Sequence, residues 1–239
     1  TPELYFTRLS QRLIGAITAP TAEGKLFDVD MRLRPSGNSG PIATPLERFL
    51  NYQRENAWTW EHMALTRARV IVADEELKNR IQSVIREVLT RERDAADLVS
   101  DVADMRDRIA REHQSDDPWA IKHYRGGLID IEFISQYLQL RHAALHPSVL
   151  AVNTTDALSK LADVKVLDRG IADELIDAMH LWRKVQGILR LSFGTEFEEV
   201  NAPEGALALL SRATKTRNYS ELKERVVSTA ADVRSHFVE

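Results

Sequence analysis

The chain has 239 residues, of which 44% are hydrophobic and 28% charged, and its formal net charge is −4 at pH 7. Acidic and basic residues are interspersed, which argues against the basic surface of a protein that binds nucleic acid or an anionic membrane. No apolar run approaches the roughly 20 residues that span a bilayer, and the chain has no cysteine for disulfides or thiolate metal sites. The absence of cysteine is consistent with a reducing compartment, and we expect a cytoplasmic protein.

The first residues of the chain, Thr1-Pro2-Glu3-Leu4, include neither an initiator methionine nor a signal-peptide pattern. We therefore expect the chain to be a piece of a longer protein. Apolar residues recur near one face of residues 3–18, which predicts a helix, and turn residues at 19–24 end it.

Residues 25–34 alternate between apolar and charged side chains, which predicts a strand. One face would carry Phe27, Val29, Met31 and Leu33, and the other Asp28, Asp30, Arg32 and Arg34. A strand needs neighbours to satisfy its backbone. Either partner strands lie upstream of this chain, or a small hairpin forms locally.

The rest of the chain predicts helices almost throughout. Thr44-Pro45-Leu46-Glu47 favours a helix start, with Thr44 as the N-cap. Further helices are expected over residues 58–73, 75–89, 94–113, 127–145, 155–163 and 170–192, after Pro203, and from Asn218 to the end. The helix at 94–113 is strongly charged, so we expect most of its surface to be solvated. The chain thus divides into residues 1–45, an incomplete mixed α/β domain, and a helical region at 46–239.

The charged face of residues 25–34 carries groups that suit nucleotidyl transfer. The carboxylates of Asp28 and Asp30 suit Mg²⁺, and the guanidinium groups of Arg32 and Arg34 suit phosphate through planar, bidentate hydrogen bonds. A Gly-rich turn at 36–40 follows and can offer backbone N–H groups to a phosphate. The alternative interpretation is a solvent-facing strand whose charges form cross-strand ion pairs.

Three motifs carry a family resemblance: F-D-V-D-M-R-L-R-P-S-G-N-S-G-P at 27–41, W-T-W-E-H-M-A-L-T-R-A-R at 58–69, and I-K-H-Y-R-G-G-L-I-D-I-E-F at 121–133. In this order, the motifs resemble glutamine synthetase adenylyltransferase, a family that also carries adenylyl-removing activity. The family has two homologous halves, each a nucleotidyltransferase domain of the polymerase-β type followed by a helical domain. One half transfers AMP from ATP to a tyrosine of glutamine synthetase, and the other removes it by phosphorolysis.

The resemblance implies a mainly α fold, in which a remnant of an α/β polymerase-β-like nucleotidyltransferase domain precedes a helical bundle. It places the third metal carboxylate at Asp30, with Asp28 secondary because the family more often has Glu there. Its first two metal carboxylates lie in a segment that this sequence lacks. Arg32 and Arg34 are implied to hold the triphosphate, and the loop that begins with Ser36 and Gly37 is implied to contact phosphate.

The implied cofactor is Mg²⁺, with ATP as substrate, and the implied partners are glutamine synthetase and a PII-type signal protein in nitrogen regulation. The motif at 58–69, and the absence of a Gly-rich patch after Leu140, resemble the C-terminal, transferase half; the removing half is the alternative. Without two metal carboxylates, the isolated chain is expected to be inactive. A function of another class is a helical interaction module that binds a partner without catalysis.

The motif at 58–69 offers two interpretations. In the functional one, Arg67 or Arg69 reaches the nucleotide phosphates. In the structural one, Arg67 pairs with Glu61 or another acid, since a charge on an apolar stripe is costly unless it is paired. We expect Trp58 and Trp60 to pack in a core or between domains rather than to stack on a base.

The motif at 121–133 is equally open. Its glycine pair precedes a helix start, where backbone N–H groups can bind an anion. In the functional interpretation, Lys122 or Arg125 contacts ATP, and Asp130 or Glu132 orients them. In the structural one, these residues form a salt-bridge network between domains.

Overall fold

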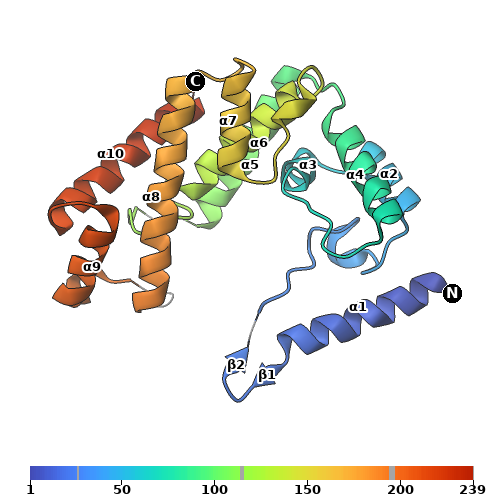
Figure 1. Ribbon diagram of the computed structural model, residues 1–239, viewed down its shortest axis with the longest axis horizontal. Coiled ribbons are helices and arrows are strands. Elements are labelled where there is room, and N and C mark those ends of the chain that lie inside the picture. The colour runs from blue at the N-terminus through green and yellow to red at the C-terminus, as the bar shows by residue number, and fades with distance from the viewer. Residues whose placement is uncertain (26, 114–115, 194–196, 239) are drawn as a thin grey trace. The chain divides into compact units, whose positions relative to one another are not determined.

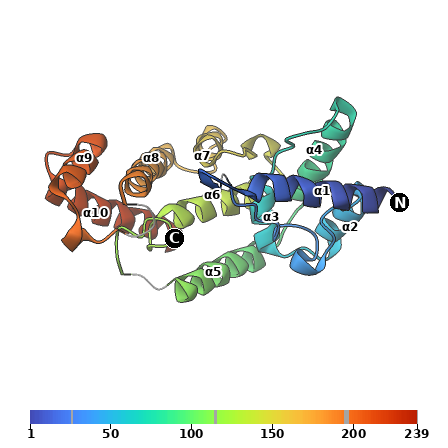
Figure 2. The ribbon, with the colours of Figure 1, turned by 90° about the horizontal axis from the view of Figure 1, so that it is seen from below.

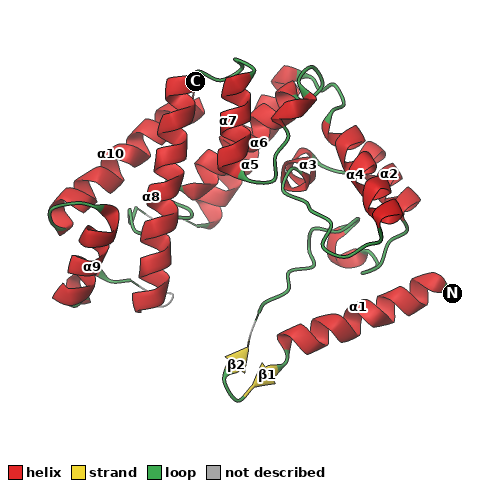
Figure 3. Cartoon of the chain, in the orientation of Figure 1, coloured by secondary structure: helices red, strands yellow, loops and turns green. Residues whose placement is uncertain are grey.

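The computed structural model describes residues 1–25, 27–113, 116–193 and 197–238 (Figure 1). These residues form ten α-helices, three 3₁₀ helices and one two-stranded hairpin (Figure 3). The predicted mainly helical fold class is thus confirmed. None of the described helices is long and apolar enough to cross a membrane. The chain forms two compact units, Thr1–Leu89 and Thr90–Glu239. The predicted domain boundary between residues 45 and 46 rests on motif content and stays a prediction.

The first unit begins with an amphipathic helix and a short hairpin. Helix α1 (Pro2–Thr18) has no buried residue. Strands β1 (Pro20–Thr21) and β2 (Gly24–Lys25) pair antiparallel, with Pro20 opposite Lys25. The elements that follow are η1 (Gly37–Ser39), α2 (Leu46–Glu55), α3 (Thr59–Leu65) and α4 (Glu75–Leu89).

The predicted strand at 25–34 is wrong beyond Lys25. Residues 27–32 have no regular secondary structure, and Leu26 lies outside the described residues. No strand in the described part of the chain offers them a ladder, so their backbone cannot form one. The predicted apolar face is also uncovered, since Phe27 is 61% and Leu33 65% exposed. A two-stranded hairpin does form over residues 20–25, but it does not pair residues 27–34.

Two helix boundaries also differ from the sequence prediction. Helix α3 ends at Leu65 rather than near residue 73, because N–H groups at its end bond three residues back and the β-branched run 70–72 disfavours a further turn. Helix α2 begins at Leu46 after Pro45 as N-cap, without a side-chain cap. The prediction that Thr44 is the N-cap is therefore wrong by one residue.

The second unit is a helical bundle (Figure 1). Its elements are α5 (Ala95–Glu112), α6 (Leu128–His142), η2 (Pro147–Val149), α7 (Thr154–Asp163), α8 (Arg169–Phe193), η3 (Glu199–Asn201), α9 (Glu204–Thr214) and α10 (Tyr219–Val238). Helix α6 is central to the bundle, because α6 contacts α5, α7, α8 and α10. Figure 2 shows α5 and α6 side by side. Helix α6 buries residues on all its faces, and its buried polar residues include Asp130. A helix buried all round must pair such groups internally.

Candidate functional site

Asp30 and Arg32 form a forked ion pair in the loop after the hairpin. Arg32 Nη2 lies 2.7 Å from Asp30 Oδ2, Arg32 Nε lies 3.0 Å from both carboxylate oxygens, and the Arg32 backbone N–H donates to Oδ1 at 2.9 Å. These hydrogen bonds lower the pKa of Asp30 to about 2. Both side chains are exposed, so the pair offers an ionised carboxylate and a guanidinium to solvent. Asp28 pairs separately with Lys25 and is more exposed.

The guanidinium of Arg34 binds backbone carbonyls on both sides of it in the chain and so stabilises the turn that follows. Nε donates to the carbonyl of Gly40 at 3.2 Å and Nη2 to that of Asn38 at 3.4 Å, while Nη1 bonds the carbonyl of Met31. Gly40 has to be glycine here, since a Cβ would lie 1.9 Å from the carbonyl oxygen of Pro35. Arg34 therefore shapes the loop more than it faces solvent.

Several backbone N–H groups of the turn at 36–40 already form local hydrogen bonds. Ser36 and Gly37 have positive φ angles of 63° and 53°. The N–H of Gly37 donates to the carbonyl of Arg34 at 2.8 Å, and those of Ser39 and Gly40 donate to carbonyls within the turn at 3.2 and 3.1 Å. Of the N–H groups in this described turn, that of Asn38 is thus left for a ligand, since that of Ser36 is directed at Tyr52.

A buried carboxylate connects α2 to α3 close to this loop. Tyr52 Oη donates to Glu61 at 2.9 Å, and the backbone N–H of Trp58 donates to Glu61 at 2.9 Å. Burial raises the pKa of Tyr52, whereas a hydrogen bond with the Ser36 backbone acts in the opposite direction. Tyr52 thus connects the turn to Glu61. The structural interpretation of the motif at 58–69 paired Arg67 with Glu61 or another acid. It did not include Tyr52, which no local pattern marks.

The remaining predicted residues lie in two places. Arg67 and Arg69 follow the end of α3 and are exposed, in the same unit as Asp30, while Lys122 belongs to the second unit. Trp58 is 70% exposed, so its predicted packing is not found among the described residues.

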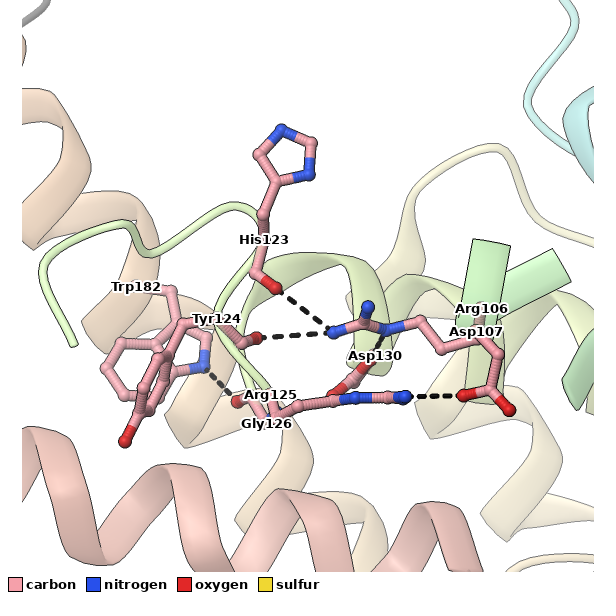
Figure 4. Close-up of polar contacts among 8 residues, drawn as sticks. All are labelled: Arg106, Asp107, His123, Tyr124, Arg125, Gly126, Asp130 and Trp182. Carbon is pink, nitrogen blue, oxygen red and sulfur yellow. Dashed lines mark hydrogen bonds and ion pairs between the residues drawn. The ribbon is translucent and has the colours of Figure 1, made fainter. Parts of the chain in front are cut away.

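In the second unit, Asp130 at the start of α6 pairs with Arg106 of α5 (Figure 4). Arg106 Nη2 also donates to the carbonyls of His123 and Tyr124 at 3.2 and 3.5 Å. The other oxygen of Asp130 accepts the N–H of Gly126. The motif at 121–133 therefore folds around a buried ion pair within one unit.

Neighbouring contacts complete this cluster. Trp182 Nε1 of α8 donates to the carbonyl of Gly126 at 3.1 Å, and Arg125 pairs with Asp107 of α5 at the surface. Gly126 has a φ angle of 84°. Sequence reasoning missed Arg106, although it follows Val102 by one helical turn on the apolar stripe of α5, and a buried stripe position is the signal that could have found it.

Two family models match the chain. Residues 1–84 match the model described as glutamate-ammonia ligase adenylyltransferase, and residues 103–239 match the one described as GlnD PII-uridylyltransferase. Over 98% of its length, the chain is 50% identical to a bifunctional glutamine synthetase adenylyltransferase/adenylyl-removing enzyme of Rhodopseudomonas palustris (strain BisB5). It is 47% identical to the enzyme of the same name from Bradyrhizobium diazoefficiens over the same share. The chain belongs to the glutamine synthetase adenylyltransferase family.

The chain spans only 24% and 23% of the length of these two relatives. Because the chain belongs to the adenylyltransferase family, its residues can be compared with the ligands that a metal ion requires. Mg²⁺ takes oxygen ligands, and the exposed, ionised carboxylate of Asp30 fits as one of them. Among the described residues, no three His, Cys, Asp or Glu side chains cluster closely enough to hold a metal. Asp30 therefore fits only as part of a ligand set.

Proposed function

We propose that this chain is part of an enzyme that transfers AMP from ATP to a tyrosine of glutamine synthetase and so regulates nitrogen assimilation. The exposed Asp30–Arg32 pair carries the proposal, because a carboxylate that suits Mg²⁺ and a guanidinium that suits phosphate lie side by side. The relatives' names include both transfer and removal of the adenylyl group. The motif at 58–69 supports the transferase half.

Each residue of the loop has a separable task in this proposal. Asp30 offers a carboxylate oxygen to Mg²⁺, which neutralises charge on the phosphates when bound. Arg32 redirects toward the triphosphate the side-chain N–H groups that here donate to Asp30. Arg34 keeps the turn at 36–40 folded, so that the backbone N–H of Asn38 faces a phosphate. Catalysis is then mainly positioning and charge neutralisation during in-line attack by the tyrosine oxygen.

Further contacts and partners belong to the same proposal. Arg67 or Arg69 adds a cation to the phosphates from the end of α3. Glutamine synthetase is the protein substrate. The match of residues 103–239 to the model described as GlnD PII-uridylyltransferase makes a PII-type signal protein the first regulatory partner to test.

The test is Arg32→Gln in the complete enzyme that contains this chain. AMP transfer to glutamine synthetase and AMP removal from the modified protein are measured separately. We expect transfer to fall by about 100-fold, as when one charge-stabilising donor is lost, and removal to persist. The control is Arg48→Gln, another exposed arginine of the first unit, which pairs with Glu3 and should change neither rate.

Two other outcomes would redirect the proposal. Loss of removal alone would assign the chain to the removing half. Retention of both rates would leave the ion pair a surface contact and favour a helical module that binds partners without catalysis.

A further inference from the structure

The second unit contains a cavity of about 810 Å³ between the loop before α6 and the C-terminal part of α8. Its apolar lining includes Ile121, Leu189 and Phe197. The volume lies within the range of roughly 300–1,000 Å³ of small-molecule sites. Such a cavity is far larger than a bare inorganic anion requires, and its apolar wall suits an organic group.

The acidic and basic side chains of the cavity differ in whether they form hydrogen bonds within the chain. Asp117 accepts the backbone N–H of Trp119 at 3.0 Å, and Glu198 accepts the side-chain amide of Asn201. By contrast, the side chains of Lys122 and Arg190 form no ion pair or hydrogen bond with any residue that the structure describes. Each acid thus accepts at least one hydrogen bond from within the chain, whereas the two cations remain available to an anion.

His123 also lines the cavity. Burial lowers the pKa of His123 to about 4, and the charges of His113, Lys122 and Arg106 act in the same direction. The His123 ring therefore stays neutral at pH 7. Its Nδ1 is enclosed without a hydrogen-bond partner among the described residues.

The wall that carries Lys122 is held in place from behind. Arg106 binds the carbonyls of His123 and Tyr124, and Asp130 binds the N–H of Gly126 (Figure 4). Lys122 therefore extends from a loop whose backbone is fixed to α5 and α6. A preformed wall lowers the ordering cost of binding.

We propose that this cavity binds a nucleoside phosphate, with Lys122 and Arg190 on the phosphate and the apolar wall on the nucleoside. Lysine and arginine are the usual phosphate-binding side chains, one as a point charge and the other as a planar fork. The proposal does not rest on AMP transfer or on Asp30, because it concerns binding by residues of the second unit alone.

The experiment is calorimetric titration of the chain of residues 1–239, in EDTA, with four probes: ATP, AMP, adenosine and inorganic phosphate. We expect ATP and AMP to bind, and adenosine and inorganic phosphate each to bind at least about ten-fold more weakly, since each lacks one half of the ligand. EDTA removes divalent cations, so binding that requires metal at Asp30 does not contribute.

Variants then locate the site. The double change Lys122→Gln with Arg190→Gln should weaken AMP binding by at least about ten-fold. The matched control is Arg183→Gln, an exposed arginine of the same helix α8 that lies outside the cavity lining. It should leave affinity unchanged, and circular dichroism should show all variants folded.

Three results would overturn the proposal. The first is no measurable binding of ATP or AMP to the unaltered chain. The second is AMP binding that the double variant retains but Arg32→Gln abolishes, which places the nucleotide in the first unit. The third is inorganic phosphate binding as tightly as AMP, which leaves the nucleoside no role.

Discussion

Arg106 of α5 and Asp130 of α6 form an ion pair whose side chains are 0% and 1% exposed. Desolvating two charges is expensive, and such a pair is sustained only when further hydrogen bonds satisfy it. Here those bonds go to the backbone of residues 123–126. The pair therefore fixes the loop between α5 and α6 as well as joining the two helices.

Removing one partner of this pair should destabilise the chain strongly. Arg106→Met leaves Asp130 buried without its cation, and Asp130→Asn leaves the guanidinium without its anion. We expect each change to lower the free energy of unfolding by about 3–5 kcal/mol, measured by urea denaturation. Combining Arg106→Met with Asp130→Asn should cost less than the sum of the two single changes, since neither charge is then left alone.

Arg125 provides the matched control for that prediction. Its ion pair with Asp107 lies at the surface, with side chains 36% and 61% exposed. Arg125→Gln should cost no more than about 1 kcal/mol. Equal destabilisation by Arg106→Met and Arg125→Gln would show that the buried pair has no special weight.

Gly126 should tolerate no side chain. A Cβ at this position would lie 1.8 Å from the carbonyl oxygen of Ala230, and the φ angle of 84° disfavours other residues. Gly126→Ala should therefore destabilise by about 2 kcal/mol or more. Gly187→Ala in α8, where a Cβ meets nothing within 4 Å, should stabilise by about 0.5–1 kcal/mol. The melting temperatures of the two variants test these predictions. Similar changes in melting temperature for Gly126→Ala and Gly187→Ala would contradict the predicted packing.

The turn held by Arg34 gives a prediction about activity. Gly40→Ala places a Cβ against the Pro35 carbonyl and should open the turn. In the complete enzyme we expect AMP transfer to fall by about ten-fold or more, because misplacing a positioning group by about 1 Å costs up to about 100-fold. Gly15→Ala in α1, where a Cβ has open space, is the control. Full activity of Gly40→Ala would show that the turn does not position substrate.

The helices could be predicted from sequence because their signals are local. The predicted helix at 94–113 is α5 (Ala95–Glu112), and Asp94 caps it by accepting the N–H groups of Ala96 and Asp97. The predicted helix at 75–89 agrees with α4. Periodicity and capping lie within a few residues of each other, so one chain segment suffices to reveal them.

Features that depend on distant residues could not be predicted in the same way. The alternation at 25–34 is genuine, but a strand also requires a neighbour, which the described residues lack. The charged helix was expected to be mostly solvated, yet its Arg106 is wholly buried beside Asp130. Asp130 lies 24 residues further along the chain, so no local pattern reveals the pair. The Tyr52–Glu61 hydrogen bond likewise joins two helices that no motif connects.

The isolated chain should not catalyse AMP transfer. Among the described residues no cluster of three metal-ligating side chains exists, and Asp30 supplies only part of a ligand set. Incubation of the purified chain with labelled ATP, Mg²⁺ and glutamine synthetase should leave the protein substrate unlabelled. Labelling that persists after repurification would mean that this chain already holds a sufficient metal site.

The most direct test of the account is Asp30→Asn in the complete enzyme, compared with Asp28→Asn, whose carboxylate pairs with Lys25 instead. We predict that Asp30→Asn lowers AMP transfer by about 100-fold or more, as loss of a metal ligand should. Asp28→Asn should have a much smaller effect, and AMP removal should persist in both. Full transfer activity in Asp30→Asn would contradict the assignment of this loop to catalysis.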